Sequence, residues 1–245
     1  MFLYLVRHGQ SVWNAENRHQ GWQNVPLSPL GELQAQRIAQ RLSNMQFDYR
    51  YTSPILRCYD TAATIVKAQG LAPETALEVD ENIKEGRISA RREGRLNKEL
   101  FSDWTDEEKR LFREDYSFKF EDGESVKGVI ERTLAFFERV AALSEEPLPD
   151  EKEEELETRP KPTPKTALVV AHLLNIQILT LYALNSLDAI QRRQDNIDRL
   201  AIGNCSLTVI ETNLKGKAPF FRVHTVSDAS HLAGLKAPEP PIAQG

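Results

Sequence analysis

The chain has 245 residues, a formal net charge of −5, and 40% hydrophobic and 27% charged residues. This length suits one large domain, and the composition is that of a globular protein. The longest apolar runs are too short to span a membrane, and the apolar start at residues 2–6 lacks the basic flank of a secretory signal. Cys58 and Cys205 are too few for a disulfide framework or a zinc cluster. We therefore expect a cytoplasmic protein with no membrane partner.

The charge is unevenly distributed along the chain. Residues 145–157 hold eight acidic side chains and one lysine, a local charge of −7 that leaves about +2 on the rest. The negative total argues against nucleic-acid binding. A slightly basic body suits a small anionic ligand, although so small a surplus by itself indicates little. Five of the 13 prolines fall within 145–165, so we expect a mobile surface insertion there. We expect this insertion to interrupt a single domain that spans residues 1–235. A flexible tail at 236–245 would follow that domain.

Apolar runs and helical periodicity alternate along the chain. We expect strands at residues 2–6, 47–52, 166–171, 205–211 and 220–226. We expect helices at about 29–45, 54–70, 123–143 and 173–184, and irregular structure over 86–122. This alternation predicts an α/β fold, a three-layer α/β/α sandwich around a mostly parallel sheet. Ligands bind such sheets at the carboxyl ends of strands, where the first strand leads into Arg7-His8 and the third into His172.

Several short motifs occur in one order along the chain. They are Leu5-Val6-Arg7-His8-Gly9-Gln10-Ser11, Trp13-Asn14, Gln20-Gly21, Pro26-Leu27-Ser28, Gly31, Ser53-Pro54-Ile55-Leu56-Arg57-Cys58-Tyr59-Asp60-Thr61-Ala62, Gly123-Glu124-Ser125, Val169-Val170-Ala171-His172, Asn204-Cys205-Ser206 and His231-Leu232. This series resembles the histidine phosphatase (phosphoglycerate-mutase-like) superfamily, in its phosphatase branch. The resemblance covers roughly residues 2–232, apart from the 145–165 segment.

The residue types in these motifs suit phosphoryl transfer. Arg7 and Arg57 each follow a strand, and arginine grips phosphate oxygens in a planar, bidentate way. The resemblance implies that His8 is the nucleophile, forming a phosphohistidine, and that His172 donates a hydrogen bond to the phosphoryl group. It also implies substrate contacts from Asn14, Gln20 and Gly21. We expect no metal and no cofactor, because the arginines and His172 supply the positive charge.

The proton donor is harder to place. The family's glutamate follows a Leu-x-Glu pattern, and Ile83-Lys84-Glu85 fits it, although Ser89 stands where a glycine is expected. Glu85 is therefore the predicted general acid, with Glu81 as the alternative if the loop is shifted. Leu173 departs from the family in the same way, because glycine usually follows the second histidine.

Other residues around these motifs have two interpretations each. A basic run after Glu85 either recognises a second anionic group or, as we favour, forms a solvated face: Arg87, Arg91, Arg92, Arg95 and Lys98. The aromatic residues that follow it either cover an organic leaving group or pack their own segment: Phe101, Trp104, Phe112, Tyr116, Phe118 and Phe120. We expect His19 and His224 at the surface or in packing, and His231 near the site as a tail anchor.

The leading functional hypothesis is a metal-independent phosphatase that hydrolyses a small phosphorylated metabolite through a phosphohistidine. The first alternative is a cofactor-dependent phosphoglycerate mutase that uses the same residues. The second is a phosphatase fold reused for binding, or for non-phosphoryl chemistry on an acidic small molecule. Leu173 and the altered loop after Glu85 motivate that reading, whereas the retained His8 opposes it. The pattern is compatible with a monomer or a homodimer, and does not identify the substrate.

Overall fold

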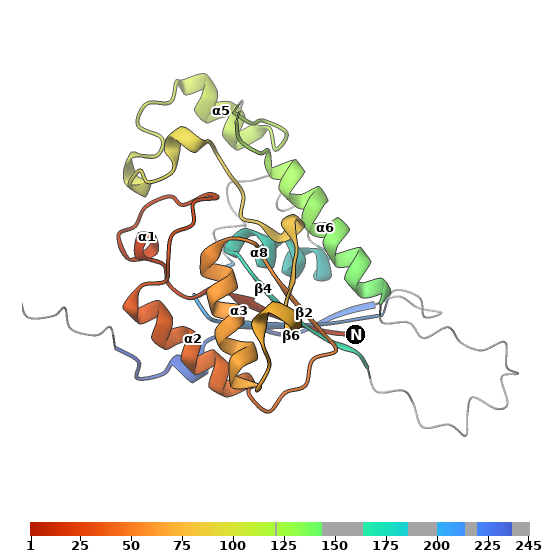
Figure 1. Ribbon diagram of the computed structural model, residues 1–245. Coiled ribbons are helices and arrows are strands. Elements are labelled where there is room, and N and C mark those ends of the chain that lie inside the picture. The colour runs from red at the N-terminus through yellow and green to blue at the C-terminus, as the bar shows by residue number, and fades with distance from the viewer. Residues whose placement is uncertain (121, 144–163, 186–199, 214–219, 237–245) are drawn as a thin grey trace, which may run out of the picture.

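The structure is a computed structural model that describes residues 1–120, 122–143, 164–185, 200–213 and 220–236. A six-stranded sheet runs through its centre (Figure 1). Across the sheet the strands are β3 (Glu78–Val79), β2 (Tyr49–Thr52), β4 (Thr166–Ala171), β1 (Phe2–Arg7), β5 (Leu207–Asn213) and β6 (Phe220–Asp228). The first four are parallel, β5 is antiparallel to β1, and β6 is antiparallel to β5. The predicted mostly parallel sheet is confirmed, with a mixed edge at its C-terminal strands.

Helices cover both faces of this sheet. The described α-helices are α1 (Val12–Ala15), α2 (Pro29–Leu42), α3 (Leu56–Ala68), α4 (Pro73–Ala76), α5 (Asp106–Glu114), α6 (Val126–Ala142) and α8 (Leu173–Ala183). Short 3₁₀ turns lie at η1 (Glu81–Ile83), η2 (Ala90–Arg92), η3 (Asn97–Glu99) and η4 (Ser230–Leu232). Buried side chains of α2 and α3 form a core with one face of the sheet, and those of α6 and α8 form a core with the other. The three-layer arrangement is therefore confirmed.

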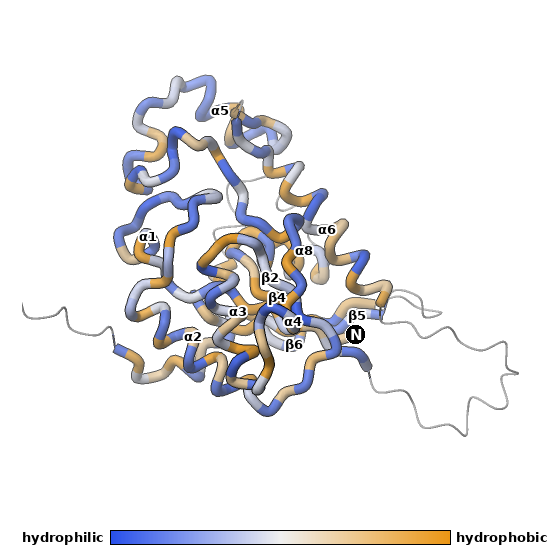
Figure 2. The backbone as a smooth tube through the Cα atoms, viewed as in Figure 1, coloured by the Kyte–Doolittle hydropathy of each residue, from blue (hydrophilic) through white to orange (hydrophobic). Residues whose placement is uncertain are grey.

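The central strands read as continuous apolar runs because both of their faces are buried. In β1, Leu3 and Leu5 join the core under α6 and α8, whereas Val6 joins the core under α2 and α3. In β4, Val169 and Val170 divide between the two cores in the same way. Figure 2 shows the hydrophobic segments gathered around these strands, with polar segments outside them. Side chains that alternate between two buried faces leave only the strand ends free for polar chemistry.

The expectation of irregular structure over 86–122 was wrong for residues 106–114, which form α5. This helix projects beyond the sheet next to the start of α6 (Figure 1). Most residues of α5 are polar, and its two apolar residues, Leu111 and Phe112, are adjacent, so its sequence lacks the repeated apolar positions that mark a packed helix. Its start is nevertheless encoded in a capping box, in which Thr105 accepts from the backbone N–H of Glu108 and the Glu108 side chain accepts in return.

Two expectations concern parts of the chain that the structure does not describe. Most of the predicted insertion at 145–165 and nearly all of the tail at 236–245 lie outside the described residues. Among the helices that are described, none combines the length and the apolar character needed to cross a membrane.

Candidate active site

Two histidines meet at the carboxyl ends of β1 and β4. These strands pair in parallel, with Arg7 opposite Ala171, so the residues that follow them emerge side by side. The backbone N–H of His8 donates to the Ala171 carbonyl at 3.1 Å. The His8 and His172 rings lie edge to face with their centroids 5.2 Å apart. The strand-end position predicted for both histidines therefore brings them together.

The contacts of His8 define its protonation state. Its Nδ1 donates to the Gly9 carbonyl at 2.7 Å, while its Nε2 accepts from Arg57 Nε at 3.3 Å. The side chain is buried, and this burial, followed by the charges of Arg57 and Arg7, holds the His8 pKa well below its ordinary value. His8 is therefore a neutral imidazole whose Nε2 carries the lone pair. That is the form required of a nitrogen nucleophile.

The two predicted arginines flank His8, and the backbone holds their guanidinium groups. Arg57, in the first turn of α3, donates to the Gly21 carbonyl at 3.0 Å and to the Gln23 carbonyl at 3.1 Å. Arg7 donates to the Ile202 carbonyl at 2.6 Å, and its buried Nε has no hydrogen-bond partner among the described residues. Gly21 has a φ of +52°, and a side chain there would collide with Glu93. The Gln20-Gly21 motif thus shapes the loop that orients Arg57.

His172 lies behind His8 rather than at the pocket surface. It is fully buried, precedes the first residue of α8, and places Nε2 2.9 Å from Ser53 Oγ and 3.4 Å from Cys58 Sγ. Burial is the main reason that its pKa lies well below the ordinary value, and Arg57 adds to the effect. His172 is the one predicted site residue that does not line the pocket described below. It reaches the reaction centre through its contact with the His8 ring.

Asn14 and Gln20 are both held by one buried residue, Ser11. The Asn14 Oδ1 accepts from the Ser11 backbone N–H at 3.1 Å, and the Gln20 Oε1 accepts from Ser11 Oγ at 2.6 Å. Both side chains line the pocket. Because their amide oxygens face Ser11, their amide nitrogens are the groups left to donate to an anion. Their predicted role as neutral donors is compatible with this arrangement.

Glu85 lines the same pocket as His8, Arg7 and Arg57. Its carboxylate accepts from the backbone N–H of Gly86 at 2.9 Å. Glu81, the alternative donor, does not line the pocket, and its largely exposed side chain pairs with Lys84. The structure therefore favours Glu85 over Glu81.

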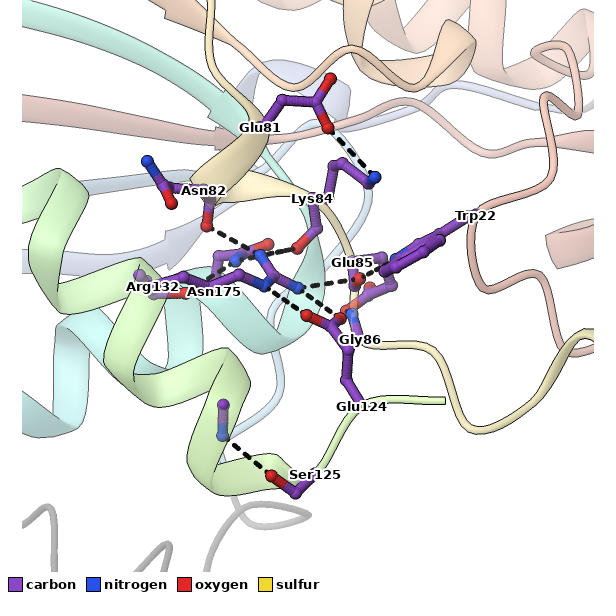
Figure 3. A network of polar contacts seen from close by, with 12 residues as sticks. Trp22, Glu81, Asn82, Lys84, Glu85, Gly86, Glu124, Ser125, Arg132 and Asn175 are labelled. Carbon is purple, nitrogen blue, oxygen red and sulfur yellow. Dashed lines mark hydrogen bonds and ion pairs between the residues drawn. The ribbon is translucent and has the colours of Figure 1, made fainter. Parts of the chain in front are cut away.

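Arg132 of α6 fastens the loop that carries Glu85 (Figure 3). It donates to the backbone carbonyls of three loop residues, Asn82 at 2.7 Å, Lys84 at 2.6 Å and Glu85 at 3.0 Å. It also forms a two-point ion pair with Glu124, at 2.9 and 3.0 Å. From the other side, Trp22 Nε1 donates to the Glu85 carbonyl at 2.8 Å. Sequence reasoning missed Arg132, because no local pattern marks a contact across 47 residues.

The pocket itself has a volume of about 350 Å³. Besides the predicted residues it is lined by polar side chains that the sequence did not mark as site residues: Arg18, His19, Asn97 and Glu124. His19 was expected at the surface or in packing, and the structure places it at the pocket, where burial lowers its pKa. Its position next to Gln20-Gly21 was the available signal.

The other two histidines lie as expected. His224 is exposed on β6 and contacts Glu211 at 2.8 Å. His231 lies 2.9 Å from the Cys205 carbonyl through its Nε2. The Cys205 backbone N–H in turn donates to the Arg7 carbonyl at 2.9 Å. His231 therefore connects the η4 turn, through Cys205, to the end of β1.

The basic and aromatic residues between Glu85 and α6 mainly pack against one another. Asp103 forms ion pairs with both Arg92 and Arg95, at 2.6 and 2.8 Å. The Arg92 guanidinium also lies over the rings of Trp104 and Phe120. Phe112 differs, because it contacts Trp104 and also lines the pocket. The packing interpretation therefore accounts for most of the aromatic residues. The solvated face expected for the basic run was wrong for Arg92, which is buried, and for Arg87, which lines the pocket.

Comparison with known proteins shows to which family this chain belongs. The model of the histidine phosphatase superfamily (branch 1) matches residues 3–220. The chain belongs to the histidine phosphatase superfamily. Phosphoserine phosphatase 1 of Hydrogenobacter thermophilus is 36% identical over 142 residues, 56% of this chain and 63% of that protein. A 2,3-bisphosphoglycerate-dependent phosphoglycerate mutase of Pseudoalteromonas atlantica is 51% identical over 65 residues, 26% of this chain and 29% of that one.

These matches span less than two thirds of the length of the curated relatives. Solved structures extend the likeness over nearly the whole chain. A mycobacterial glucosyl-3-phosphoglycerate phosphatase aligns with a TM-score of 0.68 and 25% identity, covering 92% of this chain and 98% of that one. Bacillus stearothermophilus YhfR aligns with a TM-score of 0.71 and 24% identity, covering 94% and 98%. The second likeness concerns the fold alone.

Proposed function

We propose that the chain is a phosphatase that hydrolyses small phosphate monoesters through a phosphohistidine on His8. The observation that carries the proposal is the state of this side chain. Its Nδ1 proton is donated to the Gly9 carbonyl, so Nε2 is unprotonated; it accepts a hydrogen bond from Arg57 Nε, and the charge of Arg7 also acts on the ring. A phosphoryl group whose oxygens accept from Arg7 and Arg57 would take the Arg57 hydrogen bond away from Nε2, and the lone pair of the neutral imidazole would then be free to attack phosphorus.

The reaction has two steps. First, His8 Nε2 forms a bond to phosphorus while the ester P–O bond breaks, and the leaving alkoxide takes the proton of the Glu85 carboxyl group. Second, a water molecule attacks the same phosphorus and gives a proton to the Glu85 carboxylate. The P–N bond then breaks, releasing phosphate and restoring neutral His8. Glu85 thus serves as an acid and then as a base, as general acid–base catalysis requires.

Positive charge for the transition state comes from the arginines. Arg7 and Arg57 keep their charge despite burial, because the guanidinium group has a very high ordinary pKa. Asn14 and Gln20 would add neutral hydrogen bonds to the equatorial oxygens. We therefore expect turnover without a metal ion. Over the described part of the chain no group of three or more His, Cys, Asp or Glu side chains is arranged to hold one.

Phosphoglycerate mutase activity is the second candidate, because such mutases recur among the similar proteins. A mutase returns the phosphoryl group to its substrate, whereas a phosphatase transfers it to water. With 3-phosphoglycerate as the substrate, free phosphate as the product supports the phosphatase. Conversion to 2-phosphoglycerate that depends on added 2,3-bisphosphoglycerate would support the mutase.

The Glu85→Gln variant tests the assignment of the proton donor. Glutamine keeps the size and hydrogen bonding of the side chain but cannot supply the proton that an alkoxide needs. We expect kcat on an alkyl phosphate to fall by roughly 10²-fold or more, because general acid catalysis is commonly worth that much. The loss on nitrophenyl phosphate should be much smaller, since a phenolate leaves without help. Glu81→Gln is the matched control, and should change neither rate.

Equal losses on both substrates would show that Glu85 binds substrate or supports its loop. If Glu81→Gln instead produced the leaving-group-dependent loss, the proton donor would be Glu81 on a shifted loop.

A further inference from the structure

The wall of the pocket beside the proton donor is apolar. It is built by the first residues of two helices, together with one residue from the Glu85 loop and one from α5: Val126, Val129, Leu173, Leu174, Ile88 and Phe112. Val126 and Val129 lie three residues apart on α6 and therefore share a face. Leu173 and Leu174 begin α8 directly after His172. Leu173, which stands where the family usually has glycine, thus lines the same pocket as Leu174, Val126 and Val129.

This wall touches the segment that supplies the proton. A methyl group added to Gly86, the residue after Glu85, would lie 3.1 Å from Leu174 Cδ2 and 3.5 Å from Val129 Cγ2. In the proposed reaction the leaving oxygen faces the Glu85 carboxyl group, because that group protonates it. The carbon atoms attached to that oxygen therefore meet Val129 and Leu174 rather than water. An apolar carbon skeleton gains free energy from this contact, whereas a charged group does not.

The arginines in and beside the pocket that do not flank His8 are already paired with carboxylates. Arg18 pairs with Glu16 at 2.6 Å. Arg87 Nε lies 3.3 Å from a Glu93 carboxylate oxygen, within ion-pair distance, but makes no hydrogen bond among the described residues. Arg132 pairs with Glu124, which itself lines the pocket. Among the described residues of the pocket, the positive charge that no carboxylate pairs with therefore lies on Arg7 and Arg57, where one phosphoryl group would bind.

From these two observations we infer that the substrates are phosphate monoesters of neutral, mainly apolar alcohols, and that a second anionic group on the substrate is selected against. The inference rests on the proposed function, because it takes the phosphoryl position and the role of Glu85 from it. In this inference the leaving group is recognised by four apolar side chains: Val126, Val129, Leu173 and Leu174. A carboxylate at the position of the leaving group would lose its hydration against this apolar surface.

Three alkyl phosphates with similarly poor leaving groups test the inference through phosphate release. They are 2-phenylethyl phosphate, glycerol 3-phosphate and 3-phosphoglycerate, of which the last two differ only in a terminal hydroxymethyl or carboxylate group. We expect kcat/KM to decrease in that order, by about tenfold or more at each step. In the Val126→Thr/Val129→Thr variant the preference for the phenylethyl ester over glycerol 3-phosphate should fall about tenfold.

Val140→Thr is the matched control, because Val140 is a buried residue of the same helix that does not line the pocket. It should leave the order and the ratios unchanged. A preference for 3-phosphoglycerate, or an equal loss on all three esters in the double variant, would overturn the inference. If nitrophenyl phosphate is still hydrolysed in that case, the proposed function stands. If no monoester releases phosphate, both the proposed function and this inference are wrong.

Discussion

The two buried histidines make the stability of this protein depend on pH in a defined direction. His8 and His172 both have a pKa well below the ordinary histidine value of about 6.5, mainly because burial disfavours the charged imidazolium. In the unfolded chain both rings regain the ordinary pKa. Below pH 6.5 the unfolded state therefore binds more protons than the folded state, and stability decreases as the pH falls. Above pH 7 this contribution is nearly constant.

When the pKa of a histidine in the folded state is very low, the size of its effect on the free energy of unfolding depends only on its pKa in the unfolded state. At pH 5.5 protonation of one unfolded histidine favours unfolding by up to about 1.4 kcal/mol, and at pH 7.5 by less than about 0.1 kcal/mol. The two histidines together should therefore lower the free energy of unfolding by up to about 2.7 kcal/mol between these pH values. That is a large fraction of the stability of an ordinary domain.

Urea titrations of the wild type and of the His8→Asn/His172→Asn variant, at pH 7.5 and 5.5, measure this difference. The variant should lose less stability on acidification than the wild type, by up to about 2.7 kcal/mol. Contributions from carboxylates and from the other histidines occur in both proteins and cancel. Equal losses in the wild type and the double variant would refute the assignment of both histidines as neutral groups.

Two further predictions concern the support of Glu85 and the source of positive charge. Arg132→Met should lower kcat on an alkyl phosphate by about tenfold or more but affect nitrophenyl phosphate much less, because the three backbone carbonyls of the Glu85 loop lose their hydrogen-bond donor. Arg37→Met, on the exposed side of α2, is the control. A uniform loss on both substrates would indicate a purely structural role for Arg132. Activity should persist in EDTA, and vanadate should inhibit as a phosphate-shaped anion, because Arg7 and Arg57 carry the charge compensation; activity lost to the chelator and restored by Mg²⁺ would contradict this.

The fold was predictable from the sequence wherever burial leaves a pattern. The residues of β4, Thr166–Ala171, form an apolar β-branched run, and the structure has the strand at those residues. The proline after Ser28 marked the start of α2, where Ser28 caps the helix by accepting from the Gly31 N–H. By contrast, α5 is highly polar, and its two apolar residues, Leu111 and Phe112, are adjacent and do not repeat at helical spacing. The signal that remained was its capping box.

The site divides in the same way. His8 and His172 were predictable because they follow strands that the sequence marks clearly, and parallel strands present their carboxyl ends at one edge. Glu85 was identified only through a family pattern, since its segment is a loop. The grip of Arg132 on that loop depends on how α6 packs, which no local sequence feature specifies. The apolar wall was likewise visible only as isolated residues, with Leu173 noted as a departure from the family.

Direct detection of the phosphoenzyme tests the central claim most sharply. The wild type is mixed with a substrate labelled in its phosphoryl group and quenched within milliseconds in alkaline denaturant, because the P–N bond of phosphohistidine is labile in acid. The account predicts label on the peptide that contains His8, loss of both label and turnover in His8→Asn, and retention of both in His224→Asn. Label on another residue, or turnover by His8→Asn at close to the wild-type rate, would contradict it.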